Sequence, residues 1–167
     1  MPDAWQREDN DPIMPIGVIA RKVGMSVSAV RKYEQEGLLL PHRAASGHRL
    51  FSQEDIDRIR HIHHLIQDVG LSIEAIRRMQ ALLPCWKLLG CSSATRDACP
   101  AYLDATQPCW MTKGLDCARQ GNECRECVVY CLGSLCTEEI KSLVYEQWDA
   151  SDASSRLHAL MDRKRRE

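Results

Sequence analysis

The sequence predicts a mainly α-helical protein in two parts, and three observations carry that prediction. Apolar residues recur at helical spacing over residues 13–84, and the successive apolar runs end at a glycine or a proline. All nine cysteines lie between Cys85 and Cys136. Another apolar stripe at helical spacing follows in residues 137–167. We therefore expect an N-terminal helical domain, a small irregular cysteine-rich domain at 85–136, and a C-terminal helical tail.

The first two predicted helices are short and closely spaced. The first begins near Ile16 and ends at Gly24, and Ser26 is placed to cap a second helix that ends at Gly37. Two short helices joined by a tight glycine-containing turn form a helix-turn-helix, whose second helix enters the major groove of DNA. The polar side chains expected on its outer face are Ser28, Arg31 and Lys32.

The next segment predicts a wing and two further helices. Apolar stretches flank a small-residue turn at 44–47, which is typical of a short β-hairpin. Ser52 then caps a third helix, with Asp55 three residues later as its capping-box partner. Ser72 caps a fourth helix, which Pro84 ends. The inner face of the third helix is predicted to be Ile56, Ile59, Ile62 and Ile66.

A continuous series of motifs occupies residues 15–83. It runs from Pro-Ile-Gly through Val-Arg-Lys-Tyr-Glu-Gln-Glu-Gly-Leu-Leu and Gly-His-Arg-Leu-Phe-Ser to Gly-Leu-Ser-Ile-Glu-Ala-Ile. This order resembles the winged helix-turn-helix of the MerR family. The resemblance implies a dimeric transcription regulator that binds a palindrome in double-stranded promoter DNA. It also implies an indirect action on RNA polymerase, by bending and untwisting an overlong promoter spacer.

The resemblance further implies which side chains contact DNA. Arg31 and Tyr33 would make groove and backbone contacts from the second helix, and Arg49 would hold a flanking phosphate from the wing. Tyr33 has a core position as its alternative, because its spacing from Val30 permits burial. The family usually has two tyrosines where this chain has Lys32-Tyr33, and Lys32 keeps a phosphate contact available. The expected DNA-contacting set is Ser28, Arg31, Lys32, Tyr33, Arg43, His48 and Arg49.

Charge and composition narrow the class of protein. The formal net charge is −1, but residues 12–83 carry ten Lys and Arg against seven Asp and Glu. This excess is modest, so DNA binding must rest on where the basic residues lie. We expect residues 1–12 to be a disordered acidic arm and the protein to be cytoplasmic, without a targeting signal or membrane segment. No nucleophile elbow, phosphate loop or paired carboxylate with a base occurs, so no enzyme activity is expected.

The nine thiols predict a soft-metal site. They are too dense to be isolated core residues, and a reducing cytoplasm disfavours disulfides. Thiolate ligation of a metal is therefore the leading interpretation. No histidine occurs between Cys85 and Cys136, so a site within this stretch is all-sulfur unless a carboxylate helps. The candidate ligands are Cys85, Cys91, Cys99, Cys109, Cys117, Cys124, Cys127, Cys131 and Cys136.

The cysteine spacing favours an iron–sulfur cluster over zinc. Structural zinc usually uses two Cys-x2-Cys knuckles, and only one occurs here, from Cys124 to Cys127. The run from Cys124 through Cys131 to Cys136 resembles compact iron–sulfur spacing, although it matches no standard ferredoxin pattern. The other five cysteines complete this site or build a second one. Nine is an odd number, so at least one thiol is free if each site uses four.

A weak internal repeat divides the cysteine-rich segment. Cys85-Trp86 and Cys109-Trp110 are each followed by a glycine five residues after the cysteine. The segment resembles the two-Cys-Trp domains found alone or attached to bacterial signalling proteins, which implies a bound metal or iron–sulfur cluster. We expect both tryptophans to be packing anchors rather than cofactor contacts, because each indole can bury much of the available apolar area.

These observations predict a regulator that binds a promoter palindrome as a dimer and responds through a thiolate-ligated centre. The input would be redox state, oxygen, nitric oxide or a thiophilic metal. The tail at 137–167 is expected to supply dimerisation, with packing on the cysteine-rich domain as the alternative. The alternative function is a constitutive DNA-binding or adaptor protein whose cysteine-rich module is a structural zinc site.

Overall fold

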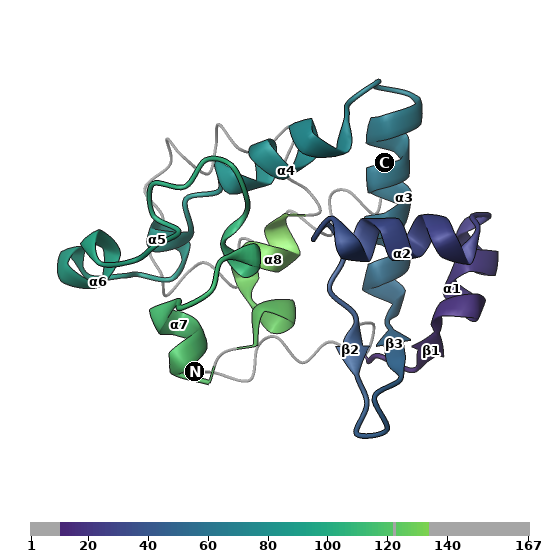
Figure 1. Ribbon diagram of the computed structural model, residues 1–167, viewed down its shortest axis with the longest axis horizontal. Helices are drawn as coiled ribbons and strands as arrows, with labels where there is room; N and C mark the ends of the chain where they lie inside the picture. Colours follow the sequence, from purple (N-terminus) through teal and green to yellow (C-terminus); the bar gives the residue numbers. More distant parts are fainter. Residues whose placement is uncertain (1–10, 122, 134–167) are drawn as a thin grey trace. The chain divides into compact units, whose positions relative to one another are not determined.

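The chain forms two compact units, which divide at Ile76 and Arg77. The structure is a computed structural model that describes residues 11–121 and 123–133 (Figure 1). The predicted acidic arm is therefore described only at residues 11 and 12. The predicted helical tail lies outside the described residues, as does Cys136.

The boundary between the units falls within helix α4 (Ile73–Ala81), whereas the sequence placed it after Pro84. The N-terminal half of α4 belongs to the first unit and its C-terminal half to the second. Ile76 is 1% exposed and belongs to the core of the first unit. Gln80 instead donates from Nε2 to the carbonyl oxygen of Gly133 at 3.0 Å, within the second unit. The change of partner therefore occurs before the helix ends.

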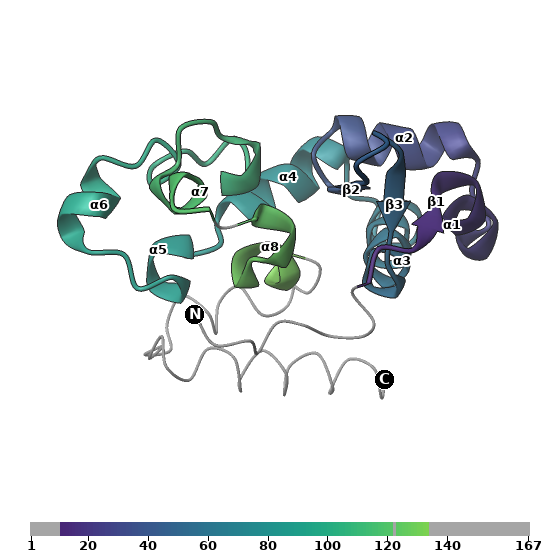
Figure 2. The ribbon, with the colours of Figure 1, turned by 90° about the horizontal axis from the view of Figure 1, so that it is seen from below.

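The described part of the first unit contains three helices, the N-terminal part of α4 and a small three-stranded antiparallel sheet. Its strand order is β1-β3-β2, with Met14 opposite Phe51 and Arg43 opposite Arg49. Figure 2 shows β1 beside β3, at the start of the chain's described part. The elements are β1 (Met14–Pro15), α1 (Ile16–Val23), α2 (Val27–Gln35), β2 (His42–Arg43), β3 (Arg49–Phe51), α3 (Gln53–Gln67) and α4.

Capping residues define the helix-turn-helix as the sequence predicts. Helix α1 ends at Gly24, which has the left-handed φ of 69° that glycine adopts without steric cost. Ser26 then begins α2, and its Oγ accepts a hydrogen bond from the backbone N of Ala29 at 3.1 Å. The predicted turn and both helix boundaries are confirmed.

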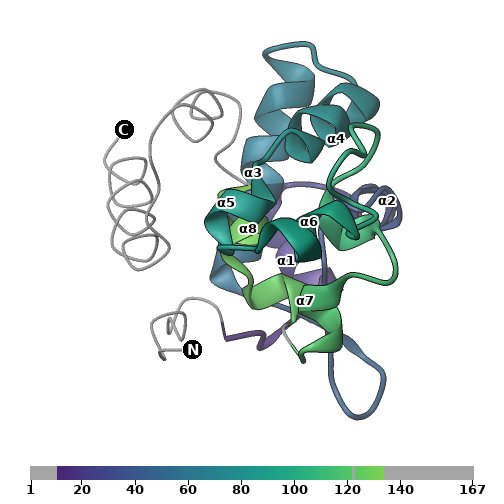
Figure 3. The same cartoon turned by 90° about the vertical axis from the view of Figure 1, so that its left-hand side faces the viewer.

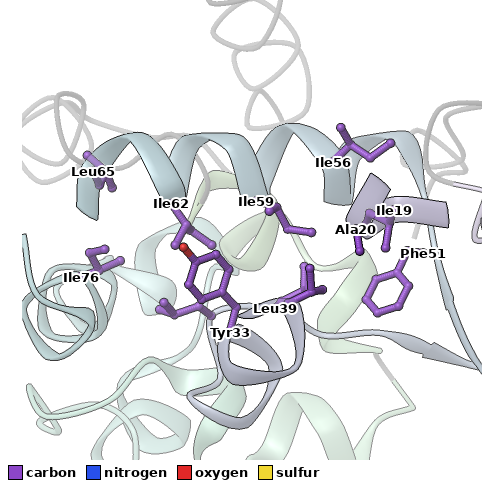
Figure 4. Packing of buried hydrophobic residues seen from close by; sticks show 12 residues of the cluster. Ile19, Ala20, Tyr33, Leu39, Phe51, Ile56, Ile59, Ile62, Leu65 and Ile76 are labelled. Carbon is purple, nitrogen blue, oxygen red and sulfur yellow. The ribbon is translucent and has the colours of Figure 1, made fainter. Parts of the chain in front are cut away.

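The core of this unit forms around the inner face of α3. Ile59 and Ile62 are at most 1% exposed and point toward Tyr33 and Leu39 (Figure 4). The fourth buried apolar residue of α3 is Leu65, at 5% exposure, whereas Ile66 is only partly buried against the cluster. The predicted stripe had Ile66 in this place. Because a helix has 3.6 residues per turn, Leu65 and Ile66 lie on the same side of α3, and Leu65 lies nearer the centre of the buried face.

Within residues 77–121 and 123–133, the second unit consists of short helical turns joined by loops, which confirms the irregular architecture that was expected for the cysteine-rich segment. Its described helices are the C-terminal part of α4, α5 (Cys85–Leu88), α6 (Ser93–Asp97), η2 (Cys109–Met111), α7 (Asp116–Arg119), η3 (Cys124–Glu126) and α8 (Val128–Leu132). Helix α5 lies beside α8 (Figure 3). Leu88, Leu115 and Leu132 are at most 3% exposed and contribute to its small core.

The two tryptophans of the internal repeat are packing residues. Trp86 meets Tyr102 edge to face, with ring centroids 5.0 Å apart, and Trp110 meets Tyr130 in the same way at 5.2 Å. Trp110 is 9% exposed. Edge-to-face aromatic pairs add to the free energy gained by burying the rings. The predicted packing of both tryptophans is observed, while the prediction that they make no cofactor contact stays a prediction. Among the described residues, no helix combines the length and apolar character needed to span a membrane.

Candidate nucleic-acid interface and thiol cluster

The outer face of α2 carries the side chains that the sequence assigned to DNA. Ser28, Arg31 and Lys32 are exposed, while Val30 is fully buried between them. The side chain of Ser28 also meets Ser26 Oγ at 2.9 Å, next to the helix N-terminus. A helix with a buried apolar face and an exposed basic face suits major-groove docking.

Tyr33 takes the core position that the sequence left open as its alternative. Its side chain belongs to the buried cluster, is 5% exposed, and lies beside Ile62 in Figure 4. Burial also raises the pKa of its phenol above the ordinary value. The main role of Tyr33 is therefore packing of α2 against α3, and the expected groove contact does not follow from its placement.

The wing is the hairpin of β2 and β3. Its turn is closed by backbone hydrogen bonds from Ala44 N to His48 O at 3.0 Å and from Gly47 N to Ala44 O at 2.8 Å. His48 is exposed at this turn, and Arg43 and Arg49 lie opposite each other on the two strands. The three predicted wing contacts therefore come from one small, ordered element.

Sequence reasoning missed one residue of this interface, Glu34 of α2. Its Oε1 accepts a hydrogen bond from Arg49 Nε at 2.7 Å and lies 3.8 Å from Arg43 Nη2. Nothing in the local sequence predicts this contact, because the arginines belong to a different element. The predicted hairpin places Arg43 and Arg49 on facing strands. Because two like charges in that position repel each other, a carboxylate nearby could have been expected.

The eight described cysteines all lie in the second unit, where each is half-buried, and we call these eight residues the thiol cluster. The repeat has a structural counterpart, because Cys85 and Cys109 each follow a proline that precedes a short helical turn. The glycine that follows each turn is left-handed, with φ of 64° at Gly90 and 79° at Gly114. The side chains of Cys85 and Cys109 are hydrogen-bonded to each other. The two halves of the repeat therefore bring their first thiols together.

The thiols influence one another's ionisation. The hydrogen bond from Cys109 lowers the pKa of Cys85, while the same bond and burial raise the pKa of Cys109. Burial raises the pKa of Cys127 to about 11. Burial, followed by the negative charges of Cys85 and other nearby thiolates, raises the pKa of Cys91. Binding of a cation would relieve this mutual repulsion, because thiolate rather than thiol is the ligand form.

The donor chemistry of this cluster fits a thiophilic metal or an iron–sulfur cluster. The thiols are soft donors and none of the eight described ones is in a disulfide. Within the described ranges, no three His, Cys, Asp or Glu side chains converge closely enough to hold a metal ion. The ninth candidate ligand, Cys136, lies outside those ranges. The structure brings the eight described candidate ligands into one unit, and it does not select a ligand set among them.

The first unit has the architecture of the winged helix-turn-helix class, and a family of known proteins matches this part of the chain. Residues 14–83 match the family described as MerR HTH family regulatory protein. This chain therefore carries a MerR-family helix-turn-helix domain at residues 14–83.

Curated relatives match over a similar length. The chain is 31% identical over 75 residues to a putative heat shock protein HspR of Streptomyces coelicolor, covering 45% of this chain and 50% of that protein. It is 34% identical over 68 residues to the HTH-type transcriptional regulator GlnR of Bacillus anthracis, covering 41% of this chain and 52% of GlnR. It is 37% identical over 70 residues to a probable heavy metal-dependent transcriptional regulator of Haemophilus influenzae, covering 41% and 54%. The chain thus spans about half the length of these relatives. No solved structure matches it.

Proposed function

We propose that the protein is a transcription regulator that binds double-stranded promoter DNA through α2 and the wing. The observation that carries this proposal is the exposure of basic side chains on both elements of a MerR-family domain. Two of the relatives described above are named as transcriptional regulators, which supports the same activity. The activity proposed is binding and regulation rather than catalysis, and the proposed site of action is the cytoplasm.

The two elements have different tasks in this proposal. Arg31 and Ser28 lie on the exposed face of α2, from which side chains reach base edges and read sequence. Lys32, Arg43 and Arg49 neutralise phosphates, which sets affinity and orientation but reads no sequence. His48 adds a contact from the tip of the wing. The MerR resemblance supports a homodimer on a palindrome and an indirect action on RNA polymerase through promoter shape.

Binding can be tested by selecting bound duplexes from a random-sequence pool and measuring affinity for the selected duplex as salt is raised. Arg49→Ala should weaken binding about equally across sequences and reduce the slope of log K against log salt by about one. Arg60→Ala removes the same charge from α3, where Arg60 pairs with Asp57 at 3.6 Å, and should leave the slope unchanged. If the slope of log K against log salt is the same for both variants and the parent protein, the wing is not part of the DNA interface.

We further propose that the thiol cluster is the effector site and holds an iron–sulfur cluster, with zinc as the alternative metal. Support comes from the eight half-buried thiols of one unit and from the cysteine spacing at Cys124, Cys127 and Cys131. One relative is named a heavy metal-dependent regulator and another, from Bacillus cereus, a mercuric resistance operon regulatory protein. A bound centre supplies a redox or metal-dependent change of state. The chain's part is to ligate the centre and to limit solvent access through the two tryptophan-anchored turns.

Metal identity has a direct test. The protein is purified without oxygen, its visible absorption is recorded, and iron, sulfide and zinc are assayed. Broad absorption at about 400 nm with stoichiometric iron and sulfide supports the sensor. A colourless protein with bound zinc supports the alternative function, a constitutive DNA-binding or adaptor protein with a structural zinc module.

A further inference from the structure

The two wing arginines, Arg43 and Arg49, both lie close to the carboxylate of Glu34 on α2. Arg49 Nε lies 2.7 Å and Arg43 Nη2 3.8 Å from the same atom, Oε1 of Glu34. The side chain of Glu34 is 15% exposed, against 39% for Arg49 and 60% for Arg43. The carboxylate is thus largely shielded from water, while each guanidinium extends from it toward solvent. Contacts of this kind hold their geometry better than fully exposed ion pairs.

The carboxylate of Glu34 reduces a charge repulsion within the wing. Arg43 and Arg49 are direct partners in the register of β2 and β3, so their side chains leave the hairpin on the same side. Like charges that face each other across two antiparallel strands destabilise the pairing. Strands of two and three residues have few backbone hydrogen bonds with which to resist that repulsion. The negative charge of Glu34 offsets it.

The geometry also fixes which atoms of Arg49 remain available. Its Nε–H is used by Glu34, and neither Nη group donates a hydrogen bond within the described part of the chain. A guanidinium is planar with five N–H donors in a rigid fork, so anchoring Nε orients both Nη groups. A phosphate would meet a side chain that is already oriented, which lowers the entropy cost of binding.

We propose that Glu34 is a positioning residue that holds the phosphate-binding arginines of the wing in a fixed place relative to α2, the helix proposed to contact the bases. The inference rests on the proposed DNA-binding function and deepens it. Glu34 touches no DNA in this arrangement. It acts through Arg49 and Arg43, and it sets the spacing between the groove contacts of α2 and the phosphate contacts of the wing.

A double-mutant cycle tests this dependence. Arg49→Ala is measured in the parent protein and in Glu34→Ala, on a mixed-sequence duplex of about 30 base pairs at low salt. We expect Arg49→Ala to weaken binding about tenfold in the parent and about threefold or less in Glu34→Ala, because an unanchored arginine contributes less. Equal factors in the two backgrounds would overturn the inference.

Removal of a negative charge near DNA changes affinity by itself, so a matched control is needed. Asp57→Ala removes an exposed carboxylate from α3, where its side chain pairs with Arg60 and contacts neither wing arginine. The effect of Arg49→Ala should be the same with and without Asp57→Ala. A parent protein that binds no duplex refutes the proposed function. A parent protein that binds DNA but gives an additive Glu34–Arg49 cycle refutes only the role of Glu34.

A second measurement uses the unmodified protein, so it tests the proposal even if the Glu34→Ala variant fails to fold. Hydrogen exchange of the guanidinium Nε–H groups is followed by NMR in the unmodified full chain. The Nε–H of Arg49 should exchange with water about tenfold or more slowly than that of Arg43, whose contact uses Nη2. Equal rates for the two arginines would contradict the anchored geometry.

Discussion

Replacement of Ser52 by alanine should destabilise the DNA-binding domain more than the same replacement of Ser72. Both serines cap helices, since Ser52 Oγ accepts from Asp55 N at 3.2 Å and Ser72 Oγ accepts from Ala75 N at 3.0 Å. Ser52 is 0% exposed, whereas Ser72 is exposed. Water can therefore replace the lost hydroxyl at Ser72 but not at Ser52.

The buried cap is part of a reciprocal pair. Asp55 Oδ2 accepts from Ser52 N at 2.7 Å and from Ser52 Oγ at 3.2 Å, and Asp55 is only 2% exposed. Loss of a helix cap costs about 0.5–2 kcal/mol, and a buried group left unpaired raises the cost. We expect the free energy of unfolding to fall by about 2 kcal/mol for Ser52→Ala and by about 0.5 kcal/mol for Ser72→Ala.

Hydrogen exchange of the full chain, read by mass spectrometry on peptides that contain Ile59 and Ile62, measures this difference. These residues lie in the core of α3 and are at most 1% exposed. Exchange there should accelerate about 30-fold for Ser52→Ala and about twofold for Ser72→Ala, because 1.4 kcal/mol corresponds to a factor of ten. Equal acceleration in both variants would refute the argument from burial.

Three further predictions concern packing and ionisation. Gly133→Ala should destabilise the second unit by about 1–3 kcal/mol in a tryptophan-fluorescence urea melt, because a new Cβ would lie 2.8 Å from an indole carbon. Gly17→Ala, which meets no atom within 4 Å, should not destabilise its helix. Burial raises the folded pKa of Tyr33 above 10.0, so its stabilising contribution is complete below that pH and is lost as pH rises through the folded value; Tyr33→Phe should therefore lose less stability between neutral and strongly alkaline pH. In metal-free protein at neutral pH, iodoacetamide should alkylate Cys85, whose pKa is lowered, before Cys127, whose pKa is raised to about 11; peptide mapping that finds the reverse order contradicts both shifts.

The first unit was largely predictable because its signals are local. Ser26, Gly24 and the pair Ser52 and Asp55 lie within three residues of the groups they cap, so sequence spacing alone identifies them. The two-residue strand β1 was missed, because Met14 and Pro15 are too few to show an alternating pattern. Its pairing with β3 depends on residues far along the chain.

The candidate site was less predictable for the same physical reason. The contact between Glu34 and Arg49 joins a helix to a strand, and no periodicity reports it. The depth of Tyr33 in the core depends on packing against α3, which its own spacing permits but does not require. The contact between Cys85 and Cys109 follows from the folding of the repeat, although the repeat was visible in the sequence.

The central claim is that DNA binding by the first unit depends on the state of the thiol cluster in the second. The most direct measurement compares affinity for a selected operator duplex in anaerobically purified protein, in the same protein after chelation, and after re-metallation. We expect operator affinity, or the distortion of the bound DNA, to change when the centre is removed and to return to its original value after re-metallation. Identical affinity and identical DNA distortion in all three states would contradict it.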